Sequence, residues 1–92
     1  MMVCMKVYLS THLRIYTNHK NMVEAEGATL ADLLWDMDRR YPGIRFRIID
    51  EQDRVREHIK IFIDEEQVHG LNIPLAEAKK VHIIGALSGG HR

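Results

Sequence analysis

The sequence predicts a two-layer α+β fold in which one helix packs against one face of a β-sheet. Several short segments alternate apolar and polar residues, which is the period of a strand with one buried face. One segment, residues 29–41, instead carries its apolar residues at helical spacing. The chain has 92 residues, which is room for one hydrophobic core and one domain, so the strands and the helix must share that core.

The first strand is predicted at residues 3–9, where apolar side chains alternate with more polar ones. Residues 10–21 are polar and irregular, and they predict a connection rather than an element. Alternation returns at residues 22–26 and stops at Gly27, which predicts a second strand. The two strands would pair through a long hairpin.

The helix has clear start and stop signals. Thr29 is a good N-cap, and Asp32 places its negative charge in the first turn, where it favours the helix dipole. Arg39 and Arg40 occupy the last turn, and Pro42 follows. The apolar stripe consists of Leu30, Leu33, Leu34, Met37 and Tyr41. A secure helix is therefore expected over the segment that Thr29 begins.

The second half of the chain predicts three further strands. Residues 44–49 are apolar but short, and the charged residues 50–58 predict a solvated loop or a frayed helical turn. The strands are expected at residues 59–63, 67–69 and 81–84, with a turn at 64–66 and an apolar-anchored loop around Pro74. The strand residues expected to face the helix are Val3, Met5, Val7, Ile59, Ile61, Ile63, Val81 and Ile83.

Composition argues against several classes of partner. Thirteen basic and thirteen acidic residues give a formal net charge of zero, which does not favour nucleic acid. The apolar runs are too short to span a bilayer, and polar residues interrupt the N-terminal segment that a secretion signal would need. Cys4 is the one cysteine of the sequence and cannot form an internal disulfide. We therefore expect a cytoplasmic protein that binds neither nucleic acid nor membrane.

The sequence offers no strong candidate for catalysis or metal binding. The histidines are His12, His19, His58, His69, His82 and His91. They include no pair four residues apart and no nearby cysteine, so no metal site is expected. Cys4 has no identifiable base beside it and is interpreted as a packing or surface residue. The acidic residues around Asp36 and Asp64 are interpreted as a solvated helix face and a turn.

The C-terminal residues point to function. Residues 1–85 are predicted to form the folded domain, and residues 86–92 a flexible arm that carries Gly89-Gly90 before His91 and Arg92. Two residues without Cβ atoms can thread a channel too narrow for side chains. A cut after Gly90 would leave an unshielded α-carboxylate for a partner enzyme to modify. The tail therefore predicts a carrier or a modifier rather than an enzyme.

Several segments are specific when their order is considered together. They are residues 13–14 with 16–17, 27–30, 41–44, 61–68 and the tail 86–90. This order resembles the ThiS/MoaD family of sulfur carriers, and most of all its CysO-like subgroup. The resemblance implies an α+β, ubiquitin-like β-grasp fold, with a mixed four- to five-stranded sheet packed on one main helix and with parallel first and last strands. The chain departs from the family in having Gly85-Ala86 where prolines are usual.

The resemblance implies a sulfur carrier protein that acts as co-substrate of partner enzymes. A JAMM-type metalloprotease would remove His91-Arg92, and an ATP-dependent adenylating enzyme of the ubiquitin-activating type would activate the Gly90 carboxylate. Gly90 would then carry a thiocarboxylate to a sulfur-accepting synthase, in the biosynthesis of cysteine or another amino acid. ATP would be used by the activating partner, with no cofactor bound by the chain. The residues expected to be recognised in the tail are Leu87, Ser88 and Gly89.

Elementary chemistry explains why such a carrier needs activation. A free α-carboxylate has a pKa of roughly 3.3–3.7 and is ionised at neutral pH, which makes it a poor electrophile. Adenylation supplies a leaving group that a sulfur nucleophile can displace. Residues 85–90 can reach roughly 20 Å when extended, at ~3.3–3.6 Å per residue. While His91 remains attached, Gly90 is an amide carbonyl and the chain is inert.

Other functions remain open at this level. The chain could be a ubiquitin-like modifier conjugated through Gly90 to lysines, a protein like the small subunit of molybdopterin synthase, or an interaction module whose tail has no chemistry. For a carrier, the strand positions opposite the core residues are the candidate partner-docking surface. These positions are Tyr8, Phe62, His82 and Ile84. The alternative is that this surface is covered by Ile44, Phe46 or the loop at Leu71.

Overall fold

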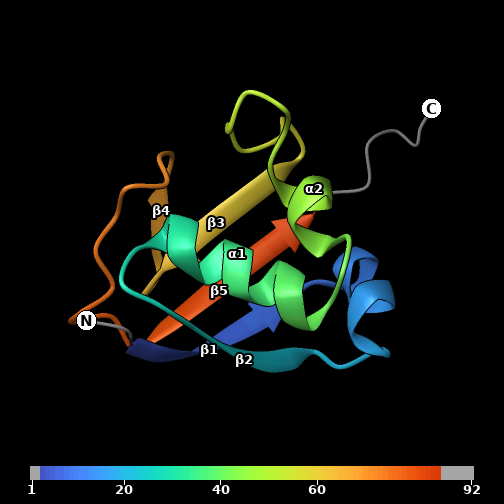
Figure 1. Cartoon of the computed structure of the whole chain (residues 1–92), viewed down its shortest axis with the longest axis horizontal. Coiled ribbons are helices and arrows are strands. Elements are labelled where there is room, and N and C mark those ends of the chain that lie inside the picture. Colours follow the sequence, from blue (N-terminus) through green and yellow to red (C-terminus); the bar gives the residue numbers. More distant parts are fainter. Residues whose placement is uncertain (1–2, 86–92) are drawn as a thin grey trace.

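The computed structural model describes residues 3–85, which form a five-stranded mixed sheet with one main helix on one face (Figure 1). The strand order is β2-β1-β5-β3-β4. Strands β1 and β5 are parallel, and the other neighbouring strands are antiparallel. The strands are β1 (Val3–Leu9), β2 (Met22–Gly27), β3 (Ile59–Ile63), β4 (Glu66–Val68) and β5 (Lys80–Gly85). The predicted α+β class is confirmed, and so is the parallel pairing that the resemblance implied.

The inner face of the sheet, the face that packs against the main helix, carries the core. Met5 and Val7 of β1 are at most 1% exposed, whereas Lys6 between them is exposed. The other strands add Val23, Ala25, Ile59, Ile61, Val81 and Ile83. Val3 and Ile63 were also predicted to face the helix, and both pack against this core, although they are only half-buried. The period-two prediction therefore holds.

The main helix α1 (Leu30–Arg40) forms where its capping signals predict it. The side-chain oxygen of Thr29 accepts the N–H of Asp32 at 3.3 Å, which satisfies one of the free donors of the first turn. Four residues of the predicted stripe are fully buried: Leu30, Leu33, Leu34 and Met37. Burial of each such side chain contributes about 1.5–3 kcal/mol relative to exposure. Tyr41, the fifth, is half-buried at the C-cap.

The end of β2 lies against the first turns of α1. A Cβ atom added to Gly27 would lie 2.4 Å from the backbone nitrogen of Leu33 and 2.9 Å from the carbonyl carbon of Asp32. No side chain fits in that space. Glycine at this position therefore allows the helix to pack directly on the strand that precedes it.

Residues 10–21 were predicted to be a connection, but they contain a 3₁₀ helix, η1 (Thr11–Thr17). Leu13 and Thr17 are fully buried there. The Thr17 hydroxyl donates a hydrogen bond to the carbonyl of Arg14 or of Lys20, at 3.2 and 2.9 Å, and Asn18 ends the helix with φ of 55°. Two buried residues in seven do not make a recognisable helical period, which is why the pattern escaped prediction.

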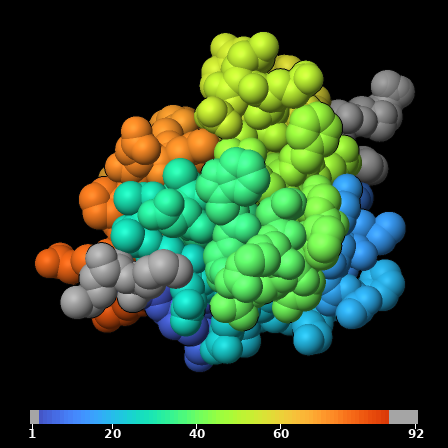
Figure 2. All heavy atoms as spheres, viewed as in Figure 1, coloured from blue at the N-terminus to red at the C-terminus, as the bar shows by residue number. Residues whose placement is uncertain are grey.

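A second short helix, α2 (Ile44–Ile48), occupies a segment to which the sequence assigned no element. Gly43, with φ of 98°, precedes it, and the Asp38 carboxylate of α1 accepts the N–H groups of Gly43 and Arg45 at 3.1 Å each. Ile44 and Ile48 are fully buried. Figure 2 shows the helix side of the molecule, where α1, α2 and the loop after α2 lie over the sheet. The helix depends on a carboxylate from another helix, a contact that no local pattern reveals.

The β3–β4 hairpin turns at Asp64 and Glu65, whose φ angles of 50° and 77° suit the twist of a two-residue hairpin. The Asp64 carboxylate also accepts the N–H groups of Lys79 and Lys80 at 3.0–3.1 Å, which fixes the start of β5. Strand β4 begins one residue earlier than predicted. The loop before β5 packs beside α1, because Leu30 donates its N–H to the carbonyl of Ile73.

Candidate functional site

The predicted chemistry falls on residues outside the described part of the chain. Leu87, Ser88, Gly89, Gly90 and His91 all lie beyond residue 85. What the structure places is the point from which the arm leaves the sheet and the surface around that point.

The arm leaves from Gly85, the last residue of β5, which is buried among three elements. Its N–H donates to the hydroxyl of Ser10 at 2.7 Å, and the N–H of Ser10 donates to the carbonyl of Ile83 at 3.1 Å. Gly85 also pairs with Ile59 of β3, and an added Cβ would lie 3.3 Å from the Cδ1 of Ile59. We call Gly85, Ser10 and Ile59 the tail root. The position and direction of the chain are therefore fixed up to residue 85.

The sequence analysis did not identify Ser10, although the expected parallel pairing of the first and last strands could have indicated it. Parallel pairing of the first and last strands places the residue after β1 beside the end of β5. A serine at that position can hydrogen-bond the backbone of the last strand. The contact joins residues 75 positions apart, so periodicity alone could not find it.

Three of the predicted docking residues lie side by side on the outer face, the sheet face opposite α1. His82 of β5 pairs in register with Tyr8 of β1 on one side and with Phe62 of β3 on the other. The rings of Tyr8 and His82 are stacked, with centroids 4.9 Å apart and an interplanar angle of 19°. We call these three residues the aromatic row. Ile84 lies two residues after His82 on the same face and pairs with Lys60.

The elements that could have covered the outer face lie elsewhere. Ile44 is fully buried in the core. Phe46 is 59% exposed on α2, and the guanidinium carbon of Arg56 lies 4.6 Å from the centroid of its ring. The loop at Leu71 packs beside α1, where the Leu71 carbonyl accepts the N–H of Ala31. The aromatic row is half-buried and Ile84 is 41% exposed. An apolar surface therefore lies open immediately before the tail root.

A shallow cavity of about 240 Å³ lies between Tyr8 and His82 of the aromatic row and Ser10 of the tail root. Arg14 of η1 borders it and donates its Nε–H to the carbonyl of Leu9 at 3.0 Å. The lining residues of the sheet and its loops are Tyr8, Leu9, Ser10, Asn21, His82, Ile83 and Ile84. The cavity combines apolar and polar walls with one guanidinium, a combination suited to a side chain of a partner protein.

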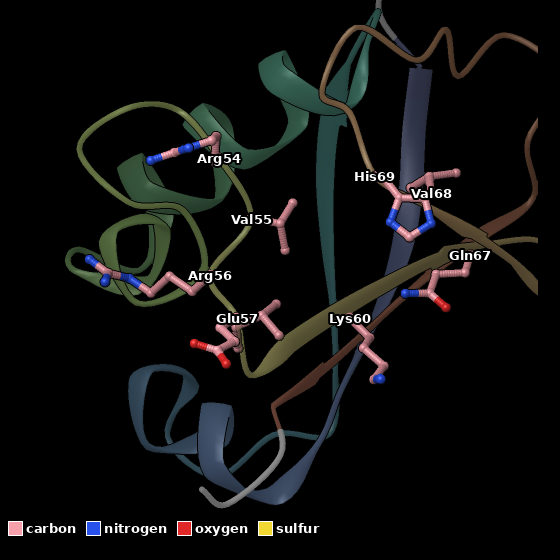
Figure 3. Close-up of a pocket in the computed structure, with 9 residues that line it drawn as sticks. Arg54, Val55, Arg56, Glu57, Lys60, Gln67, Val68 and His69 are labelled. Atoms are coloured by element: carbon pink, nitrogen blue, oxygen red, sulfur yellow. The ribbon is translucent and has the colours of Figure 1, made fainter.

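A larger cavity of about 360 Å³, between the loop after α2 and strands β3 and β4, carries several cations (Figure 3). The ends of Arg54 and Arg56 point toward the loop, away from Lys60 and His69. Arg56 donates its Nε–H to the carbonyl of Phe46 at 2.7 Å, and Arg54 donates to the side chain of Gln52 at 3.0 Å. The two guanidinium groups, Lys60 and His69 do not converge on one point, so the cavity does not resemble an anion-binding site.

Asp36 is the clearest correction to the sequence interpretation, which placed it on a solvated helix face. It is 7% exposed and accepts the N–H of Glu26 at 2.8 Å, together with hydrogen bonds from Arg39 and Arg40. Burial by itself would raise its pKa, but these hydrogen bonds outweigh burial and hold the pKa of Asp36 below the usual value. Because β2 is an edge strand, this carboxylate ties a free edge N–H to α1 and has a structural role.

Two further properties of residues 3–85 concern their metal-ligating side chains and the length of their helices. In that range no group of three or more His, Cys, Asp or Glu side chains could hold a metal ion. Cys4 is exposed on β1. Each helix within residues 3–85 is too short or too polar to span a bilayer.

The chain is similar to known proteins of one family. The ThiS family model matches residues 7–90. The chain is 32% identical over 89 residues to the sulfur carrier protein CysO of Mycobacterium tuberculosis, covering 91% of this chain and 96% of that one.

Solved structures agree with this match. The structure is similar to Mycobacterium tuberculosis CysO, with a TM-score of 0.83, 28% identity and coverage of 90% of this chain and 99% of that chain. It is equally similar to a chain of the Amycolatopsis orientalis BexX/CysO complex, with a TM-score of 0.83, 29% identity and coverage of 94% and 99%. Small archaeal modifier protein 1 of Haloferax volcanii shares the fold, with a TM-score of 0.79, 20% identity and coverage of 96% and 100%. The ubiquitin-like β-grasp prediction is thereby confirmed, and the chain belongs to the ThiS family, as a sulfur carrier of its CysO-like subgroup.

Proposed function

We propose that this chain delivers sulfur as a thiocarboxylate on Gly90 and has no catalytic activity of its own. The main support is the family membership together with a tail that contains Gly89-Gly90 and leaves from a fixed root at Gly85. The described residues add an open apolar surface beside that root, which suits a protein whose tail is handled by partners.

The first step is hydrolysis of the Gly90–His91 amide. Water adds to the Gly90 carbonyl, the bond to the His91 nitrogen breaks, and the dipeptide His91-Arg92 leaves with a free amine. A JAMM-type metalloprotease is the class of enzyme that fits this cut. The product carries an ionised α-carboxylate, with an ordinary pKa of roughly 3.3–3.7.

The second step is activation and sulfur transfer. The Gly90 carboxylate attacks the α-phosphate of ATP on an adenylating partner, which forms an acyl adenylate and releases pyrophosphate. Hydrosulfide supplied by the sulfur donor then attacks the acyl carbon, the bond to AMP breaks, and loss of the S–H proton leaves the thiocarboxylate. That sulfur passes to a synthase that makes cysteine or another amino acid. The amino-acid product is favoured by the similarity to CysO.

Partners are proposed to dock on the outer face, around the aromatic row and Ile84. A solved structure of a relative is named as a complex of BexX and CysO, and we propose that this chain likewise forms a protein complex in its function. Half-buried aromatic side chains near the centre of a surface are typical binding hot spots. The surface adjoins the tail root, so a docked partner would receive the arm directly.

Intact mass measurement tests the proposed chemistry. The chain ending at Gly90, incubated with the adenylating enzyme of its own cell, ATP and a sulfur donor, should gain about 16 Da as one oxygen is replaced by sulfur. The uncut chain that retains His91-Arg92 is the matched control and should not change. Conjugates joined to lysines of other proteins would instead show a modifier, and an unaltered chain would show a module without tail chemistry.

A second experiment tests docking on the outer face. Phe62→Ala should raise the KM for the chain in ATP–pyrophosphate exchange by about tenfold, which is typical for loss of a hot-spot side chain. Phe46→Ala is the control, because Phe46 is an exposed aromatic on α2. An equal effect of the two substitutions would rule out the outer face as the docking surface.

A further inference from the structure

The aromatic row is surrounded by positive charge. On the outer face, Lys6 lies two residues before Tyr8 on β1, and Lys80 lies two residues before His82 on β5. Lys60 of β3 pairs with Ile84 of β5. The fourth cation is Arg14, which borders the cavity next to the row. Lys6 and Lys60 are exposed, whereas Lys80 and Arg14 are half-buried. We call these four residues the basic rim.

No residue of the basic rim forms an ion pair within the part of the chain that the structure describes. Ion pairs there involve Arg39, Arg40, Arg45 and Arg54, all on or next to the two α-helices, and none involves a rim residue. The hydrogen bond from Arg14 uses its Nε and goes to a neutral carbonyl, so its charge is not compensated by that contact. Four arginines of the helix layer and the loop after α2 thus have acidic partners, whereas the four cations of the outer face have none in residues 3–85.

Two of the rim lysines are placed directly against each other. Lys6 and Lys80 are partners in the parallel β1–β5 ladder. Like charges opposite one another on neighbouring strands destabilise a sheet. Lys6 also has Glu24 opposite it on β2, which offsets part of that repulsion. A repulsion retained beside an exposed apolar surface is typical of a residue kept for binding rather than for folding.

The negative charges near the rim lie at its edges. Glu24 and Glu26 belong to the edge strand β2. Asp64 lies in the β3–β4 turn, with its carboxylate engaged by two backbone N–H groups, and Glu57 precedes β3. The centre of the outer face, across β1, β5 and β3, is therefore apolar and cationic.

We infer that the outer face binds a partner surface that presents carboxylates around an apolar contact, and that this surface belongs to the enzyme that activates Gly90. The inference rests on the proposed function for the identity of the partner. Complementary charges at the rim of an apolar contact increase the association rate and fix the orientation of the partners. The orientation determines whether the arm, starting at the tail root, enters the active site. A nucleic acid is the less favoured occupant, because the chain has no net positive charge.

A binding experiment tests the inference without the enzyme. An acetylated peptide of alternating glutamate and leucine is titrated into the isotope-labelled chain, and amide chemical shifts are followed. Shifts should be confined to β1, β5 and β3 around the aromatic row, and they should disappear in the double variant Lys60→Glu, Lys80→Glu. Arg47→Glu is the control, since Arg47 is exposed on α2. Shifts elsewhere, no shifts, or stronger binding of single-stranded RNA to the same residues would overturn the inference.

A kinetic experiment tests the partner. In ATP–pyrophosphate exchange by the adenylating enzyme, the double variant should raise the KM for the chain about tenfold or more, with kcat unchanged. The KM of the unaltered chain should rise with salt, and that of Arg47→Glu should match it. A KM that changes neither with salt nor in the double variant would overturn the inference, and the proposed function would still stand. If the unaltered chain is not activated at all, the proposed function is contradicted. The peptide titration would then still show whether the outer face prefers carboxylates.

Discussion

The two faces of the sheet are built from the same five strands, yet they differ in what their side chains do. Ile83 on the inner face is fully buried against the helix layer, whereas Ile84, the next residue, is 41% exposed on the outer face. The inner face is almost wholly aliphatic. The outer face mixes aromatic rings with lysines that form no ion pair within residues 3–85. The comparison teaches that the inner face carries the stability of the domain, and we propose that the outer face serves recognition.

The largest expected effect comes from a matched pair of substitutions in β5. Ile83→Ala should destabilise the domain by about 2–5 kcal/mol, because it removes buried methyl groups and leaves a cavity. Ile84→Ala should cost less than about 1 kcal/mol, because the side chain is partly in water. Urea unfolding at equilibrium measures both. Equal losses would show that the outer face is also part of the core.

The close contact between β2 and α1 gives the next effect. Gly27→Ala should destabilise the domain by about 1–3 kcal/mol, because its Cβ would overlap the backbone of Leu33 and force the helix away from the inner face. Gly70→Ala is the control, since nothing lies within 4 Å of a Cβ at that position. The midpoint of thermal unfolding compares them. An unchanged midpoint for Gly27→Ala would mean that the helix can shift without cost.

Asp36 connects the helix layer to the edge of the sheet. Asp36→Asn should cost about 1–2 kcal/mol at neutral pH, a value kept low because the Arg39 side chain is 71% exposed and its ion pair is screened by water. The pKa of Asp36 is lowered on folding, so its stabilising contribution is present above the ordinary value of 3.8 and is lost as the pH falls through the folded pKa.

Unfolding of Asp36→Asn and of the unaltered chain should therefore be compared between pH 7 and pH 2. The difference in stability should be constant down to about pH 4 and then shrink. A difference that is independent of pH over this range would show that the charge of Asp36 does not contribute.

The smallest expected effect is at the tail root. Ser10→Ala should reduce stability by about 0.5–1.5 kcal/mol, the usual contribution of one hydrogen bond. Its local signature is faster hydrogen exchange of the Gly85 amide, which loses its acceptor. Ser10→Thr keeps a hydroxyl and should preserve slow exchange. If exchange at Gly85 is unaffected by Ser10→Ala, the hydroxyl does not hold the start of the arm.

Much of the fold could be predicted because its signals are local. The alternation in β1 and β5 and the cap of α1 at Thr29 each depend on residues close in sequence. The short helices could not be predicted in this way. The N-terminus of α2 is capped by Asp38 of α1, and η1 is held by the burial of Leu13 and by the Thr17 hydroxyl. Propensity and periodicity carry no information about such contacts.

The candidate docking residues show the same division. Alternation indicated that Tyr8, Phe62, His82 and Ile84 face away from the core, because successive side chains of a strand point to opposite faces. Alternation does not state which strands are neighbours. His82 lies between Tyr8 and Phe62 because β5 inserts between β1 and β3.

Local chemistry along the chain was thus enough to establish one capped helix, alternating strands and a glycine-rich terminus in a sequence that resembles sulfur carriers. Assembly of the sheet alone placed Ser10 at the N–H of Gly85, Lys6 against Lys80, and the aromatic row beside the root of the arm. The physical reason is that strand order and register are properties of long-range pairing. The residues adjacent in sequence determine which face of the sheet a side chain lies on, but only the folded sheet determines which side chains it contacts there.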